Sequence, residues 1–174
     1  METLKHLSLI AIILLSSACT SISSVHPLGT DTVQLVEHEW RGTWIAQDGT
    51  LQLDVLDTKA GIIELVFIEH GKIEKYTVTI KKSGQDTYMN LLNKDKSYLF
   101  AKFKKRYNQI IVWPPSSKAM KVAIASEAIK GEITKDDDLL ITADKDNLNK
   151  FFADNSEKML FEYDEPVVFR KNVK

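Results

Sequence analysis

Seven short apolar runs, separated by turn-forming residues, dominate the chain between positions 42 and 113. They cover residues 42–47, 51–55, 62–68, 76–80, 88–92, 98–103 and 110–113. The runs are rich in β-branched and aromatic residues, and several alternate apolar with polar positions, as half-buried strands do. The links between them are too short for the crossover that a parallel neighbour needs, so we expect an antiparallel meander.

The last third of the chain has a different pattern. Residues 117–130 show the apolar spacing of a helix that ends at Gly131, and Asp144 is typical of an N-cap for a second helix over 147–155. Two more short strands are expected, at 139–142 and 167–170. A meander of this length must protect its edge strands, and closure into a barrel achieves this. We therefore expect a mainly β fold: a small barrel of about eight strands with two short helices.

Composition places the chain among ordinary globular proteins. It has 174 residues, 44% of them hydrophobic and 27% charged, which is typical of one domain. The 23 Lys and Arg nearly balance the 24 Asp and Glu, so the net charge of −1 gives no argument for nucleic acid. One cysteine cannot form an internal disulfide, so the apolar core alone must hold the fold.

The first eighteen residues have the pattern of a targeting segment. Lys5 precedes an apolar run of nine residues, LSLIAIILL, at positions 7–15. A helix of this length spans about 14 Å, which is too short to cross a hydrocarbon core of roughly 30 Å. A short apolar run followed by small residues instead predicts a cleavable secretory signal at 1–18.

Residues 15–19, Leu-Ser-Ser-Ala-Cys, resemble the lipobox of bacterial lipoproteins, and Cys19 is the only cysteine of the chain. The resemblance implies that Cys19 is diacylated on sulfur, becomes the new N-terminus and is acylated again on its amine. Such multiple acylation is enough for stable membrane anchoring. Thr20 stands where the family has an Asp for inner-membrane retention, which favours an outer-membrane location facing the periplasm.

The stretch 19–36 is rich in Ser and Thr and shows no sustained period, so we predict a flexible tether behind the lipidated cysteine. A free chain of about sixteen residues would hold the domain ~20–25 Å from the acyl groups. The folded domain is then expected to cover residues 37–174.

Gly42-Thr43-Trp44, within the run Trp-Arg-Gly-Thr-Trp at 40–44, opens the first predicted strand. This tripeptide is similar to the strand opening of lipocalins and avidins, the calycin superfamily. The resemblance implies a barrel in which the Trp plugs one end and packs on an Arg near the last strand, here Trp44 with Arg170. Ala46 stands where avidins carry a biotin-binding Asn, which argues against biotin.

The sequence contains no motif for a metal or a cofactor. Its four His are scattered, and the acids at 136–138, 144 and 146 lack the spacing of a calcium loop. The motifs that present a nucleophilic serine are also absent. His38 and His70 could each act as a base, but neither has an identifiable partner, so an envelope hydrolase directed at peptidoglycan is kept only as the alternative to a non-enzymatic protein.

Charge is unevenly placed along the chain. Residues 72–121 carry twelve basic against three acidic side chains, whereas residues 132–165 carry eleven acidic against four basic. One basic run is a candidate contact surface for a partner or for anionic lipid, and otherwise it is a solvated hairpin end: Lys102, Lys104, Lys105, Arg106 and Tyr107. A periplasmic location argues against nucleic acid as its ligand.

Together these patterns predict a non-enzymatic, lipid-anchored envelope protein that serves in binding or assembly. Two versions stay open, because an eight-stranded barrel is wide enough either to hold a small ligand or to be filled by side chains. A hollow barrel would carry an apolar small molecule. A filled barrel would act through its surface on another envelope protein, and the density of large apolar residues in the strands favours this version.

Overall fold

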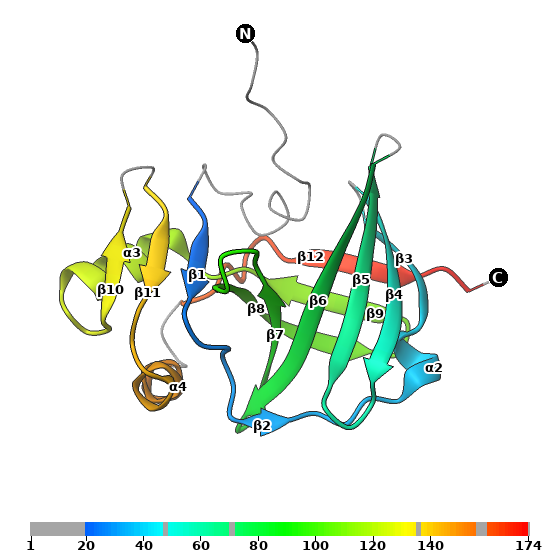
Figure 1. Ribbon diagram of the computed structural model, residues 1–174, viewed down its shortest axis with the longest axis horizontal. Helices are drawn as coiled ribbons and strands as arrows, with labels where there is room; N and C mark the ends of the chain where they lie inside the picture. The colour runs from blue at the N-terminus through cyan, green and yellow to red at the C-terminus, as the bar shows by residue number, and fades with distance from the viewer. Residues whose placement is uncertain (1–19, 47–48, 70–71, 135–136, 156–159, 174) are drawn as a thin grey trace, which may run out of the picture.

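Eight strands form a closed antiparallel ring in the computed structural model, which describes residues 20–46, 49–69, 72–134, 137–155 and 160–173 (Figure 1). Their bounds are β3 Gly42–Ala46, β4 Gly49–Asp57, β5 Ile62–Glu69, β6 Lys72–Ser83, β7 Asp86–Leu92, β8 Tyr98–Arg106, β9 Gln109–Trp113 and β12 Val167–Lys171. Each strand pairs with the next, and β12 closes the ring by pairing with both β9 and β3. The predicted antiparallel barrel of about eight strands is confirmed, and each of the seven predicted runs lies in one of its strands, apart from position 47, which lies outside the described residues.

Alternate residues of each strand fill the barrel interior, because neighbouring side chains on a strand point to opposite faces. The large inward-facing side chains, none more than 5% exposed, include Trp44, Phe67, Ile80, Leu91, Phe103 and Phe169. Outward positions between them carry polar residues such as Gln52 and Thr77. The apolar alternation seen in the sequence is therefore the inner face of the ring.

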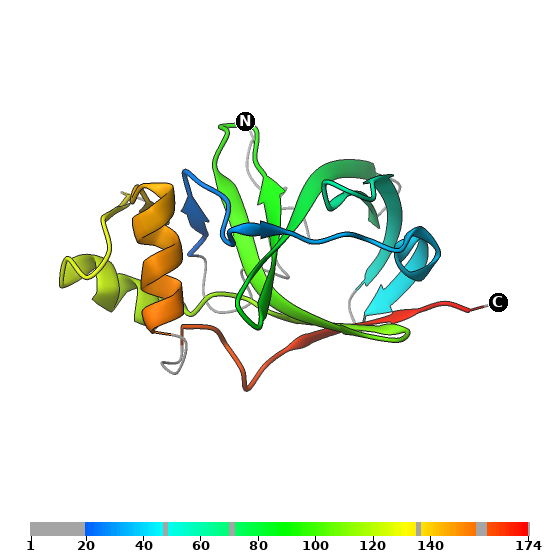
Figure 2. The same cartoon turned by 90° about the horizontal axis from the view of Figure 1, so that it is seen from below.

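One end of the barrel is closed by the N-terminal segment. The short strand β2, Asp31–Thr32, pairs with the last residues of β6, and the chain then crosses the barrel end to the helix α2, Glu37–Trp40 (Figure 2). Leu35 and Trp40 on this crossing are buried in the barrel core. We call this the closed end. The last residues of β3 and β5 and the first residues of β4 and β6 lie at the opposite end.

A second core covers the outer face of β7 and β8, and we call its elements the outer layer. They are β1 Ile22–Ser24, α3 Ser117–Ala125, β10 Gly131–Ile133, β11 Leu139–Ile141 and α4 Lys145–Asp154. β1 pairs antiparallel with β8 and parallel with β11, and β11 pairs with β10. Tyr88 and Phe100 point outward from the barrel and meet the rings of Phe161 and Phe152, respectively.

The segment 20–36 belongs to the folded domain, so the prediction of a flexible tether is wrong for these residues. Ile22 is 6% exposed, Leu28 is fully buried, and β1 is hydrogen-bonded on both sides. The folded domain therefore includes residues 20–36 and does not begin at residue 37. The Ser-rich composition is misleading because the polar side chains lie between a few apolar ones that find partners far along the chain.

Two buried asparagines hold this segment against the barrel. Asn90 accepts a hydrogen bond from the Leu28 N–H at 2.7 Å, and it donates to the Leu28 carbonyl at 3.0 Å and to a β6 carbonyl at 3.3 Å. Asn149 accepts from the Gly29 N–H at 2.7 Å. Gly29 has a φ of +103°, and a Cβ there would lie 2.6 Å from the Cβ of Lys81, so the close approach requires glycine.

The helices also differ in part from expectation. α3 ends at Ala125, well before Gly131, because the chain turns back on itself with Glu127 at a φ of +59° and the Ala128 N–H bonded to the Ala123 carbonyl. α4 has the predicted N-cap, since Asp144 accepts from the backbone N–H three residues on, but the helix begins directly after it. None of the described helices has the length and apolarity to cross a membrane.

Replacing Asn90 with alanine should destabilise the whole domain. The change leaves the buried N–H and carbonyl of Leu28 without partners, and we expect a loss of about 2–4 kcal/mol in the free energy of unfolding, measured by urea denaturation. Asn108→Ala, at an exposed turn, is the matched control and should stay within about 0.5 kcal/mol of wild type. Equal effects of the two substitutions would contradict the role given to Asn90.

Candidate functional site at the closed end of the barrel

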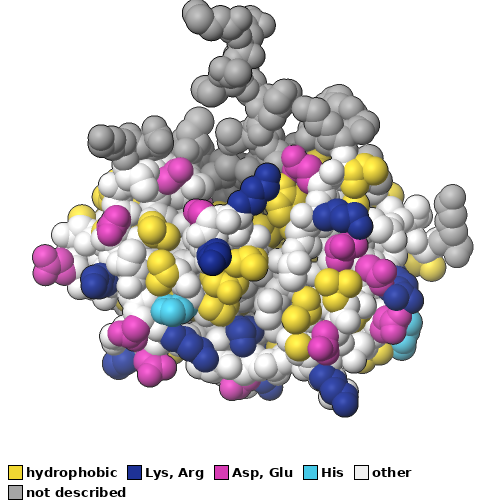
Figure 3. All heavy atoms as spheres, viewed as in Figure 1, with side chains coloured by type: hydrophobic (Ala, Val, Ile, Leu, Met, Phe, Trp, Pro, Cys, Tyr) yellow, Lys and Arg dark blue, Asp and Glu magenta, His cyan; other side chains and the backbone are white. Residues whose placement is uncertain are grey.

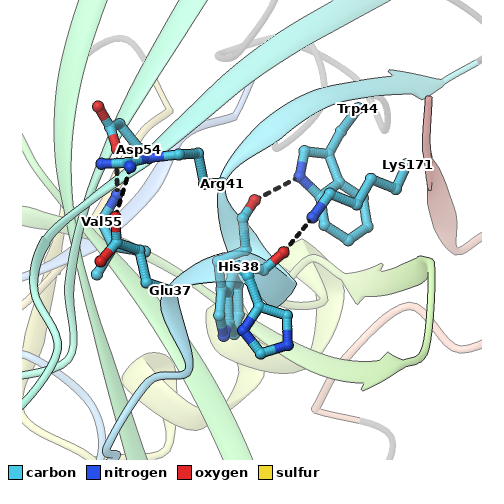
Figure 4. Close-up of polar contacts among 8 residues, drawn as sticks. Glu37, His38, Arg41, Trp44, Asp54, Val55 and Lys171 are labelled. Carbon is cyan, nitrogen blue, oxygen red and sulfur yellow. Dashed lines mark hydrogen bonds and ion pairs between the residues drawn. The ribbon is translucent and has the colours of Figure 1, made fainter. Parts of the chain in front are cut away.

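Trp44 lies at the closed end, where it is fully buried and donates its Nε1 hydrogen to the Trp40 carbonyl at 2.8 Å. Lys171 approaches from the last strand. Its Nζ lies 5.7 Å from the centroid of a Trp44 ring and donates to the His38 carbonyl at 2.6 Å (Figure 4). The face of a Trp ring attracts a cation, so these contacts tie β12 to α2.

The expected partner of Trp44 was Arg170, and the register of β12 corrects this by one residue. Arg170 pairs with Ile45, whereas Lys171 pairs with Trp44. Because adjacent residues face opposite sides of a strand, Lys171 turns toward the barrel interior and Arg170 toward solvent. The resemblance therefore predicted a cation over the Trp, but the wrong residue.

Lys105, from the basic run, also points to the closed end. Its Nζ lies 5.8 Å from the centroid of a Trp40 ring and 2.8 Å from Glu39 Oε2. The hydrogen bond and positive charge of Lys105 hold the pKa of Glu39 below its usual value. Burial, together with the nearby charge of Lys105, lowers the pKa of Lys171.

Lys102 lies on the other face of β8, among polar groups beside the outer layer. Its Nζ is 2.7 Å from Asp86 Oδ1 and donates to the Tyr163 hydroxyl at 3.1 Å. The Tyr88 hydroxyl is 3.5 Å from the same Asp86 carboxylate. Burial and the negative charge of Asp86 raise the pKa of Tyr88 well above its ordinary value. The Lys102 side chain is therefore engaged in polar contacts within the fold.

Three cations point outward near the closed end. Arg106 pairs with Gln109, and Gln109 pairs with Arg170, so these residues share the outer face of three neighbouring strands, with Lys104 two residues along β8. In the part of the chain that the structure describes, none of the three cations has an ion-pair partner. Tyr107, 94% exposed, projects from the adjoining turn. We call Lys104, Arg106, Tyr107 and Arg170 the basic surface.

The basic run predicted from the sequence is thus divided among three places. Lys104, Arg106 and Tyr107 stay together on the surface, whereas Lys102 and Lys105 are engaged on opposite faces of β8. The sequence did not predict that Arg170 belongs to the basic surface, because only the β9–β12 pairing shows that it lies beside these residues. On the face drawn in Figure 3, acidic and basic side chains are interspersed.

The space left inside the barrel is small. A cavity of about 60 Å³ lies among apolar side chains that include Trp40, Trp44, Leu91 and Phe169. Pockets that hold small-molecule ligands typically measure about 300–1,000 Å³. In this conformation the barrel is therefore filled by its own side chains, as in the second of the two versions predicted from the sequence.

Within the described residues, no group of three or more His, Cys, Asp or Glu side chains could hold a metal ion. His38 is exposed on α2, and Cys19 and His70 lie outside the described residues, as does the predicted signal 1–18. Comparison of the chain with known family models, with curated proteins and with solved structures finds no match.

Tyr88 should make the fold sensitive to alkali. Its pKa in the fold lies above the unfolded value of about 10, so its contribution to stability is complete below pH ~10 and is lost as the pH rises further. Urea denaturation at a series of pH values should show a smaller alkaline loss of stability in Tyr88→Phe than in wild type. Tyr107→Phe, the same change at an exposed site, should behave as wild type. An unchanged alkaline loss in Tyr88→Phe would exclude this role.

Proposed function

We propose that this chain is a lipoprotein, attached to a bacterial envelope membrane through acyl groups on Cys19, whose barrel is a non-enzymatic binding or assembly module that works through its outer surface. The lipobox-like residues 15–19 support the anchor. The observation that carries the surface role is the filled barrel. A cavity of about 60 Å³ has no room for a carried ligand of ordinary size.

The exposed side chains of the basic surface make it the favoured contact region. Its cations form no ion pair with any residue that the structure describes, so their charge is available to attract and orient an oppositely charged partner. The exposed Tyr107 adds the kind of aromatic side chain that often dominates binding energy at protein interfaces. The class of partner that fits is an envelope protein with an acidic surface.

The anchor is tested by substitution of Cys19. Wild-type chain, produced in a bacterium with two membranes, should fractionate with the membranes, and its N-terminal peptide should carry the added mass of acyl groups. Cys19→Ala removes the only thiol and should abolish that mass. Ala18→Gly, a small-to-small change beside it, should leave the mass in place. A wild-type chain without the acyl mass would refute the anchor.

The contact region is tested by reversing its charge. Lys104, Arg106 and Arg170 are changed together to Glu, and a control carries Glu at the exposed outer-layer positions Lys118, Lys130 and Lys145. Both triple variants change the formal net charge from −1 to −7, since each of three substitutions removes two units. Poly-L-glutamate, as a probe of acidic surfaces, should bind wild type and the control in a salt-dependent manner, and binding should be lost in the first variant. Equal loss in both variants would show that only net charge matters.

A further inference from the structure

The described chain is fixed to the domain from its first residue, Thr20. The Thr20 side chain is 6% exposed, with its hydroxyl 3.5 Å from Asp137 Oδ2. The Ser21 N–H donates to Asp138 Oδ1 at 2.6 Å, and the Ser21 carbonyl accepts from the Leu139 N–H at 2.8 Å. Cys19 directly precedes this anchored residue in the sequence, and consecutive Cα atoms are about 3.8 Å apart.

If Cys19 carries the acyl chains, as proposed above, no length of free chain separates the membrane from the domain. The predicted tether would have allowed ~20–25 Å of separation and free rotation. Residues 20–36 are instead part of the fold, so the membrane surface must pass close to Thr20. The position of Thr20 therefore decides which side of the molecule meets the lipid.

Thr20 lies on the side of the molecule opposite the closed end. Figure 1 shows the start of β1 on the same side as the end of β10 and the start of β6, whereas α2, β2 and the end of β6 lie on the other side. Two isoleucines at these strand ends are exposed, Ile73 by 65% and Ile133 by 47%. Apolar side chains that reach the headgroup region of a bilayer stabilise such contact. Exposed apolar residues occur at the closed end too, so the place of Thr20 carries the argument.

We infer that the barrel stands on the lipid surface with the end opposite α2 against the bilayer, while the closed end, near which the basic surface lies, points away from it. The inference rests on the proposed acylation of Cys19. It assigns the lipid headgroups as the contact of one barrel end, and it places Lys104, Arg106 and Arg170 where a protein partner can reach them and the membrane that holds the anchor cannot.

The two ends of β6 allow a direct test. Ile73 lies at its start and Gln85 in the turn after its end, twelve residues further along the chain. That separation is roughly 40 Å along an extended strand, or about 30 Å along the axis of a barrel with strands tilted by ~40°. Because acylation blocks the only native thiol, a fluorophore attached to Ile73→Cys or to Gln85→Cys reports from one end alone.

Each labelled, full-length acylated protein is placed in phosphatidylcholine vesicles, with and without a lipid that carries a quenching nitroxide on its headgroup. The label at Ile73 should lose emission when the quencher is present, and the label at Gln85 should not. Inserting a flexible Gly-Ser segment of about sixteen residues between Cys19 and Thr20 should remove the difference, because the domain then moves freely.

The possible outcomes separate the two proposals. Acylated protein that binds vesicles but shows equal quenching of both labels, or stronger quenching at Gln85, overturns the orientation and leaves the lipoprotein assignment standing. Protein whose N-terminal peptide lacks the acyl mass overturns the assignment and the orientation with it. A difference that persists after the flexible insertion shows that the short connection is not its cause and overturns the inference as stated.

Discussion

The arrangement depends on the strand β8, because it is shared between two cores. Its later residues pair with β9 and complete the barrel wall, whereas Tyr98 and Leu99 pair with β1. β9 ends at Trp113, and the chain leaves the ring there to build the outer layer. Phe100 then faces the outer layer while Ala101 faces the barrel interior. One strand thus supplies side chains to both cores. Removal of either core would therefore expose the other core to solvent.

The barrel was predictable from the sequence because its evidence is local. The alternation of apolar and polar residues in 76–80, for example, predicts which side chains face inward. Asp144 can be recognised as an N-cap from the residues next to it. The place of residues 20–36 was not predictable in this way. Leu28 is buried because Asn90 lies across from it, and no local pattern links positions 62 residues apart.

The closed end shows how small a difference separates a correct from an incorrect site. A cation was expected over Trp44, and a cation is there, but a shift of one residue along β12 replaces Arg170 with Lys171. The same shift moves Arg170 to the outer surface beside Arg106. The sequence shows which alternate residues of a strand share a face, whereas the register between β12 and its neighbours is fixed only by the assembled ring. The candidate surface was therefore predicted in part: Lys104, Arg106 and Tyr107 came from one run, and the fourth member, Arg170, came from another strand.

The hydrogen bond between Gly29 and Asn149 joins residues 120 positions apart, and β1 lies in parallel beside β11. Contacts between such distant parts of a chain form slowly, because a long loop must close before any favourable interaction is gained. As the chain emerges in order from its N-terminus, β1 has no neighbour on its β11 side until residues 139–141 have followed. The first described residues of the domain therefore cannot complete their pairing until most of the chain has followed, and the barrel itself closes later still, when β12 pairs with β9 and β3.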